Sequence, residues 1–192
     1  MARKYEMRKR AKRVEETRRR IVEAAIDLHE RVGPARTSLS SIAEQAGVER
    51  QTYYRHFPDE RALISACSGL WIERNPLPDG GPWREIGDPE ERLRRGLGEI
   101  YAFYEANQAM LSSVLRDAEI HDPTREVVTQ GIAPAIVGLG TALASGWAKS
   151  PATRAAIDLA LGFHTWRSLT GQSGLSADRA AELMAKIVRC AG

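Results

Sequence analysis

Residues 39–57 read Leu39-Ser-Ser-Ile42-Ala43-Glu-Gln-Ala46-Gly47-Val48-Glu-Arg-Gln-Thr-Tyr53-Tyr54-Arg-His-Phe57, and this stretch decides how the N-terminal part of the chain folds. It predicts two short helices, about 39–46 and 49–56, that pack across one another. Ala43 is small enough for a close crossing, and Gly47 permits the left-handed turn between the helices. Their shared core is formed by Ile42, Ala46, Val48 and Tyr53. The second helix presents polar residues outward, as a helix that enters a DNA major groove does.

Helices are also predicted on both sides of this pair. Before it, apolar residues follow the spacing of one helix face until Gly33-Pro34 ends the run. Ser38 is suited to cap the helix over 39–46, because its hydroxyl can accept a bond from a free amide of the first turn. Asp59 can cap a fourth helix that ends near Asn75-Pro76. The apolar stripes of the first and fourth helices are Ile21, Ala24, Ala25, Leu28 and Val32, and Ala62, Leu63, Ala66 and Leu70.

The rest of the chain has a different pattern. Residues 75–88 are rich in proline and glycine and predict a loop. Long helices are expected near 89–105, 107–120, 123–148, 151–170 and 176–190. No alternating run of β-branched residues occurs, so the sequence predicts an all-α protein.

Composition narrows the possible functions. The chain has 192 residues, 43% of them hydrophobic, which is enough to form a sizeable core. Cys67 and Cys190 lack the spacing of a disulfide framework or zinc ribbon, and the four histidines are dispersed, so no metal is expected. No signal peptide or membrane-spanning stretch is expected, which favours the cytoplasm. The glycine pairs fit neither a dinucleotide fingerprint nor a nucleophile elbow, so we expect no catalytic residues, no cofactor and no enzyme.

Positive charge is concentrated at the N-terminus. Residues 1–61 hold 15 basic and 10 acidic side chains, whereas residues 62–192 hold 13 basic and 15 acidic ones. A basic arm beside a folded domain commonly contacts DNA phosphates, because it releases condensed counterions. The alternative interpretation is a solvated, flexible tail. The basic residues of the first twenty are Arg3, Lys4, Arg8, Lys9, Arg10, Lys12, Arg13, Arg18, Arg19 and Arg20.

The segment from about Thr17 to Trp71 resembles the DNA-binding domain of TetR-type transcriptional repressors. The matching residues are Gly33, Thr37-Ser38, Ile42-Ala43, Ala46-Gly47-Val48, Thr52, Tyr54, His56-Phe57 and Leu63. The resemblance implies a dimeric regulator with an N-terminal three-helix helix-turn-helix domain and a C-terminal helical domain for ligand binding and dimerisation. The expected boundaries are a basic arm over 1–16, the helix-turn-helix domain over 17–58, a connecting helix over 59–74 and the effector-binding and dimerisation domain over 75–192.

The resemblance also implies DNA contacts. Ser38, Tyr54 and His56 would touch phosphates, while Arg50, Gln51 and Tyr53 would lie near base edges; Thr52 and Arg55 complete the expected DNA-binding set. For Tyr53, packing in the core is the stronger interpretation, and Gln51 is either a reader of adenine or a solvated side chain. Three residues depart from the family pattern: Glu49, Gln51, and Glu60, where a lysine is usual. A carboxylate at position 60 would repel phosphate unless Arg61 replaces the missing charge.

In the C-terminal region, apolar residues on two faces of the helix near 151–170 indicate two partners, the chain's own core and a second subunit. Ile157, Leu161 and His164 form one face, and Ala152, Ala155, Ala156, Leu159, Phe163 and Trp166 form the other. The last helix adds a further apolar stripe, so we expect a homodimer, with a larger monomeric core as the alternative.

A pocket for a small apolar or aromatic effector is expected between the middle helices, with ordinary core packing as the alternative for each residue. Its candidate residues are Trp71, Tyr101, Tyr104, Met110, Leu111, Val114 and Phe163. The predicted function is ligand-controlled repression at a palindromic operator in double-stranded DNA, with no membrane partner. The alternative is a DNA-binding scaffold that has no small-molecule ligand and acts through a protein partner.

Overall fold

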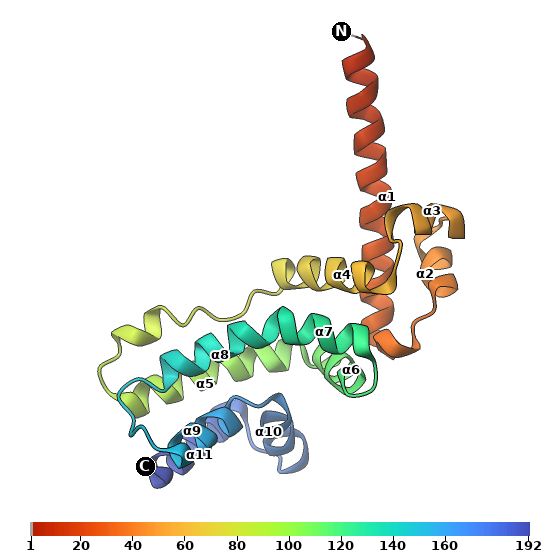
Figure 1. Ribbon diagram of the computed structural model, residues 1–192. Helices are drawn as coiled ribbons and strands as arrows, with labels where there is room; N and C mark the ends of the chain where they lie inside the picture. Colours follow the sequence, from red (N-terminus) through yellow and green to blue (C-terminus); the bar gives the residue numbers. More distant parts are fainter. Residues whose placement is uncertain (1) are drawn as a thin grey trace. The chain divides into compact units, whose positions relative to one another are not determined.

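The computed structural model describes residues 2–192, and the side chains of residues 5–192 (Figure 1). Met1 and the side chains of Arg3 and Lys4, which belong to the expected basic arm, lie outside the described residues. Helices, turns and loops make up the described chain and no strand occurs in it, so the all-α prediction is confirmed. Two compact units are present. The first comprises residues 1–75 and 109–129, and the second comprises residues 76–108 and 130–192.

The first unit is built around one long helix. Its core includes residues from four helices, among them Ile21, Ile42, Tyr53 and Leu63. Because the predicted caps are present, the helix boundaries fall close to those expected from the sequence. The helices are α1 (Ala2–Val32), α2 (Leu39–Ala46), α3 (Arg50–His56), α4 (Glu60–Arg74), α6 (Gln108–Ala118) and α7 (Asp122–Gln130), with a short 3₁₀ helix over Pro34–Arg36.

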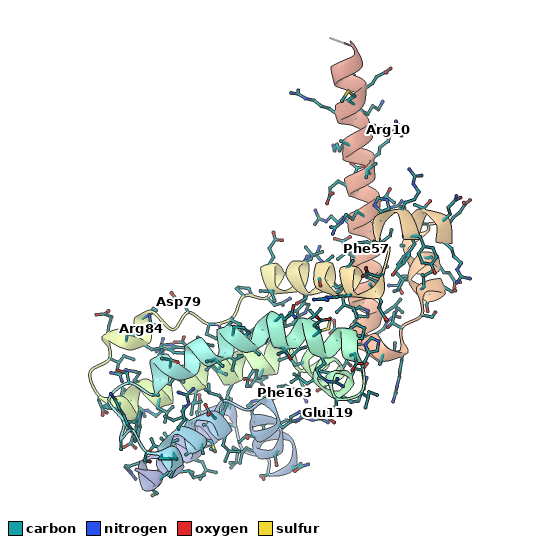
Figure 2. All side chains as sticks on the ribbon, in the orientation of Figure 1. Arg10, Phe57, Asp79, Arg84, Glu119 and Phe163 are labelled. Carbon is teal, nitrogen blue, oxygen red and sulfur yellow. The ribbon has the colours of Figure 1, made fainter. Side chains whose placement is uncertain are left out.

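The expected basic arm is part of helix α1. Residues 2–20 contain no glycine or proline and are rich in Arg, Lys, Glu and Ala, which favour helix, so nothing in the sequence ends the helix before Val32. Figure 1 shows the N-terminal half of α1 extending beyond α2, α3 and α4, and Figure 2 shows Arg10 on this extension. The side chains of residues 5–16 are exposed. The arm is therefore a helical rod that carries positive charge.

Residues 109–129 pack with the N-terminal unit, which differs from the division expected at residue 75. The reason is a set of polar contacts that α6 makes with the end of α1 and with the 3₁₀ helix that follows it. The buried carboxylate of Asp117 accepts a hydrogen bond from the Ala35 amide at 2.9 Å, and the Ser113 hydroxyl donates to the Glu30 carbonyl at 3.0 Å. These pairs join residues about 80 positions apart, beyond the range of local sequence patterns.

The second unit contains the remaining helices. Helix α11 packs against both α5 and α9. The buried Arg92 donates to the backbone carbonyls of Trp83, Ile86 and Ser145, which fixes the loop before α5 to the loop after α8. The elements are the 3₁₀ helix Pro82–Glu85, α5 (Pro89–Ala106), α8 (Ile132–Leu143), α9 (Pro151–Ala160), α10 (Phe163–Arg167), a π-helical turn over Ser168–Gln172, and α11 (Ala177–Ala191).

Two of the expected long helices are split. The helix predicted over 123–148 consists of α7 and α8, with the break at Gly131. Pro134 explains this break, because its ring would clash with the carbonyl of residue 130 in a continuous helix. The helix predicted over 151–170 ends at Ala160, and α10 begins after Gly162. His164 is exposed, so its predicted place on an apolar face with Ile157 and Leu161 was wrong; the assignment assumed an uninterrupted helix.

One helical stretch, Asp122–Leu143, is long and apolar enough to cross a membrane by length and composition alone. No membrane-spanning stretch was expected from the sequence, and this match by itself is weak evidence for one. The stretch begins with the charged residues Asp122, Arg125 and Glu126 and is divided between α7 and α8 at Gly131. Length and apolar composition are also shared by core helices of globular proteins, so they are weak grounds for a membrane span.

Candidate nucleic-acid interface

Helices α2 and α3 form the predicted helix-turn-helix. The Ser38 hydroxyl caps α2 by accepting a hydrogen bond from the Ser41 amide at 3.1 Å. Gly47 has φ 63° and ψ 43°, the left-handed conformation predicted for the turn, and the Val48 amide donates to the Ala43 carbonyl at 2.9 Å. The turn therefore satisfies the free end of α2 while it redirects the chain into α3.

Helix α3 divides its residues between core and surface. Arg50, Gln51 and Arg55 are exposed, as is Tyr54, which keeps 52% of its surface accessible. Thr52 and His56 are half-buried. The outward face of α3 thus presents two guanidinium groups, an amide and a phenol, all of which can bond to base edges or phosphates.

Tyr53 lies in the core of this unit. It is 4% exposed, and its ring contacts the rings of Tyr54 and Phe57. Burial raises the pKa of Tyr53 to about 12, with a smaller effect from Glu60, so its hydroxyl stays protonated at neutral pH. This burial agrees with the prediction that Tyr53 packs in the core.

Positive charge gathers at the C-terminal end of α3. The Arg18 guanidinium of α1 lies 5.0 Å from the centroid of the Phe57 ring, a cation–π contact that holds the arginine beside the end of α3. Burial lowers the pKa of His56, and the nearby Arg55 and Arg18 lower it further. The neutral form of His56, which can both donate and accept a hydrogen bond, is therefore favoured in the free protein.

The start of α4 carries the departure from the family pattern at position 60. The Glu60 carboxylate lies 3.4 Å from His121, and the Arg61 guanidinium forms an ion pair with Glu126 at 2.7 Å. Both partners come from residues 121–126. In this structure Arg61 is engaged by a carboxylate, so it does not simply replace the cation that the family usually has at position 60.

The expected effector-binding residues fall in both units. Trp71, Met110, Leu111 and Val114 belong to the first, and Tyr101, Tyr104 and Phe163 belong to the second. All except the half-buried Val114 are buried. The Tyr101 hydroxyl donates to the Ala160 carbonyl at 2.8 Å, and the Tyr104 hydroxyl donates to the Leu161 carbonyl at 2.6 Å.

An aromatic cluster surrounds Tyr104. Its ring packs edge-on against Phe163 with centroids 5.5 Å apart, and Trp166 lies 5.8 Å from the same ring. The indole N–H of Trp166 is buried and has no hydrogen-bond partner in the described chain. An unsatisfied buried donor is costly, so this nitrogen is a candidate anchor for a polar ligand atom.

Sequence reasoning missed Asp117 and Arg116. A signal was present, because Asp117 follows Val114 by three residues and therefore lies on the apolar face of α6 that also bears Met110 and Leu111. A carboxylate on such a face needs a buried partner.

Within the described residues, no group of three or more metal-ligating side chains is placed to hold an ion.

The chain resembles known regulators in sequence. The sequence model described as "Bacterial regulatory proteins, tetR family" matches residues 21–67, which hold the core of α1, all of α2 and α3, and half of α4. The HTH-type transcriptional regulator SrpR of Pseudomonas putida is 29% identical over 158 residues, which cover 71% of this chain and 72% of SrpR. The HTH-type transcriptional regulator TtgR, from a strain of the same species, is 42% identical over 96 residues, 50% of this chain and 46% of TtgR.

The fold also has counterparts among solved structures. A TetR-like transcriptional regulator from Rhodococcus sp. RHA1 superposes with a TM-score of 0.63 at 20% sequence identity. The superposition covers 90% of this chain and 93% of that one. The similarity of fold thus extends through both units, while the 42% identity with TtgR is confined to half of the chain.

Proposed function

We propose that this chain, whose residues 21–67 match the tetR family model, is a DNA-binding transcriptional regulator of the TetR family, and that it is a homodimeric cytoplasmic repressor released from a palindromic operator by a small molecule. The observation that carries the DNA-binding part is the exposed face of α3. Arg50, Gln51 and Arg55 point outward from a helix held by the left-handed turn at Gly47.

Within the proposed interface, two classes of contact are distinguished. Arg50 and Gln51, at the start of α3, read base edges, while Ser38, Thr52, Tyr54, Arg55 and His56 bind the phosphate backbone. Tyr53 supports α3 from the core. A dimer that reads a palindrome holds its two α3 helices about 34 to 36 Å apart, one turn of DNA.

The proposed dimer surface lies on the second unit. Ala152, Ala155 and Leu159 of α9 are exposed, and so are Leu183 and Ile187 of α11. Each set lies along one side of its helix, as expected for faces that pack against a second subunit. The predicted second face of α9 is thereby supported at Ala152, Ala155 and Leu159. Ala156 is buried, and Phe163 and Trp166 lie buried in α10, so these three residues do not belong to that face.

The proposed effector is small and largely apolar, with at least one polar atom. The support is the unsatisfied Trp166 N–H within the aromatic cluster of Tyr104 and Phe163. For an effector to move the protein from mostly bound to mostly released, it must prefer the released form by roughly 10⁴-fold. That preference requires extensive contacts with one conformation.

Two experiments test the proposal. Selection of binding sites from random duplexes, followed by sedimentation of the complex, is expected to yield a palindrome bound by two copies. Recovery of no enriched sequence would contradict operator recognition.

Thermal shifts and native mass spectrometry against a metabolite library are expected to identify a ligand that weakens operator binding. Its effect should be reduced by Trp166→Phe, which removes the N–H and keeps an aromatic ring. Persistent absence of any such ligand would favour regulation through a protein partner.

A further inference from the structure

The loop between α1 and α2 is held by two consecutive residues of α6, here named the anchor pair, Arg116 and Asp117. One carboxylate oxygen of Asp117 accepts from the Ala35 amide at 2.9 Å, and the other accepts from Arg116 Nε at 2.8 Å. Arg116 Nη2 then donates to the Val32 carbonyl at 3.0 Å. The anchor pair therefore satisfies a free carbonyl at the end of α1 and an amide of the following turn.

Gly33 makes this contact possible. It adopts φ +94°, which disfavours other residues. A Cβ at this position would also lie 2.2 Å from Asp117 Oδ2 and 2.3 Å from Arg116 Nη2. The backbone and the side chains of α6 thus meet at van der Waals distance, so the loop has little freedom to shift while the anchor pair is in place.

The anchored loop leads directly to the DNA-reading elements. The Thr37 hydroxyl donates to the Gly33 carbonyl at 2.8 Å, and the next residue, Ser38, caps α2. Helix α2 in turn carries α3 through the turn at Gly47. Asp117 itself is 1% exposed, so its carboxylate is not available to bind DNA.

We infer that Arg116 and Asp117 are positioning residues for operator binding, which set the start of α2, and through it the placement of α3, from a helix outside the helix-turn-helix. This inference rests on the proposed function, because it concerns how the same DNA-reading surface is held. It assigns residues 109–118 a role in DNA recognition that their distance in sequence from residues 39–57 conceals.

The test compares two substitutions that change charge equally. Asp117→Asn removes the buried carboxylate and turns an amide donor toward the amide of Ala35 or the guanidinium of Arg116. Asp122→Asn, the control, removes an exposed carboxylate from the start of α7. Each adds one unit of positive charge, which by electrostatics alone strengthens DNA binding. We expect Asp117→Asn instead to weaken operator binding about tenfold, a loss opposite in sign to the charge effect.

Two further measurements separate positioning from general damage. Binding to a scrambled duplex should stay equal for Asp117→Asn and Asp122→Asn, because the phosphate-binding groups are intact. The Ala35 amide should exchange with solvent faster in Asp117→Asn than in the control. If Asp117→Asn does not fold, Ser113→Ala provides a milder variant, since it removes only the bond to the Glu30 carbonyl. That variant should weaken operator binding about two- to threefold.

The outcomes are distinguishable. A folded Asp117→Asn protein that binds the operator as tightly as Asp122→Asn overturns the inference and leaves the proposed function intact. An equal loss on operator and scrambled duplex also overturns it, because positioning affects the specific complex. If the unmodified protein binds no duplex at all, the proposed function fails, and the inference fails with it.

Discussion

At the scale of the residue, burial separates side chains that sequence pattern alone treats alike. Tyr53 and Tyr54 are adjacent on α3, yet one is 4% and the other 52% exposed. The helical period of 3.6 residues turns neighbouring side chains by about 100°, which is enough to place one in the core and the other at the surface. The sequence favoured packing for Tyr53 and phosphate binding for Tyr54.

The adjacent tyrosines give the first prediction. Tyr54→Phe should weaken binding to operator and scrambled duplex alike, by about 1 kcal/mol, because it removes one hydrogen bond to the backbone. Tyr53→Phe, the matched control, should leave both affinities unchanged. Titrations of labelled duplexes followed by anisotropy provide the measurement. A loss confined to Tyr53→Phe would place the DNA-contacting hydroxyl at position 53.

The second residue-scale prediction concerns Arg50. Arg50→Ala should lower operator affinity by about 1 to 3 kcal/mol and reduce the preference for operator over scrambled DNA, as loss of a base contact does. Arg84→Ala, which removes an exposed arginine of the 3₁₀ helix Pro82–Glu85, outside both proposed surfaces, serves as the control. The same titrations at fixed salt measure the affinity of each variant for the operator and for scrambled DNA. If affinity falls while the preference is retained, Arg50 binds phosphate.

At the scale of the element, the charge pattern of the basic arm did not indicate its conformation. Its composition indicates phosphate binding, but its geometry is that of helix α1 continued to Ala2. A helix of about 15 residues is only marginally stable by itself in water, so continuity with the packed part of α1 favours helix in the extension. The arm therefore presents its charges along one axis.

Deletion of residues 1–13 is predicted to weaken binding to all duplexes and to flatten the salt dependence, because it removes seven basic side chains. Ala11→Pro keeps every charge of the arm and interrupts the helix, so it should retain most of the salt slope. Affinities measured over a range of salt concentrations test both variants. A deletion that leaves the slope unchanged would show that the arm does not contact phosphates.

At the scale of the whole molecule, the two units divide the work proposed for the protein. The first holds the DNA-reading helices and the anchor pair, and the second holds the aromatic cluster and the exposed stripes of α9 and α11. In the proposed function, recognition of a palindrome needs two copies of α3, so DNA affinity is expected to depend on association of the second unit with its copy in a second chain.

The dimer is tested by Leu159→Glu and Ile187→Glu. Both side chains are exposed, so each variant should fold, yet a carboxylate in an apolar interface should shift the protein toward monomer and lower operator affinity. Ser173→Glu adds the same charge at an exposed loop position and should remain dimeric. Sedimentation velocity distinguishes these states. Unchanged dimers in both interface variants would exclude α9 and α11 as the contact surface.

Stability against pH is the last prediction. Burial lowers the pKa of His29 to about 4, an effect opposed by Asp117 and reinforced by His121. The unfolded chain binds this proton below about pH 6.5, so stability should be fully present above that pH and decrease by up to about 3 kcal/mol as pH falls toward 4. In denaturant unfolding, His29→Leu should reduce this pH dependence, whereas His164→Leu, at an exposed site, should not. A pH dependence unchanged by His29→Leu would contradict the assignment.

The sequence by itself determined the local structure of this protein. The boundaries of α2, the left-handed turn at Gly47, the Asp59 cap of α4 and the outward polar residues of α3 follow from residues a few positions apart. Helix capping and periodicity act over one or two turns, so a single sequence contains their full information. The breaks at Gly131 and Gly162 also have local causes, Pro134 and Gly162, which disfavour a continuous helix, although uninterrupted helices were predicted there from the sequence.

Only the tertiary structure decided which elements pack together. It assigned residues 109–129 to the DNA-binding unit through Asp117 and Ala35, which are 82 positions apart, and it buried Tyr101 and Tyr104 against carbonyls nearly 60 positions away. It also paired Arg61 with Glu126. Such contacts depend on where distant backbone groups meet in space, and no periodicity or composition of a single chain specifies those meeting points.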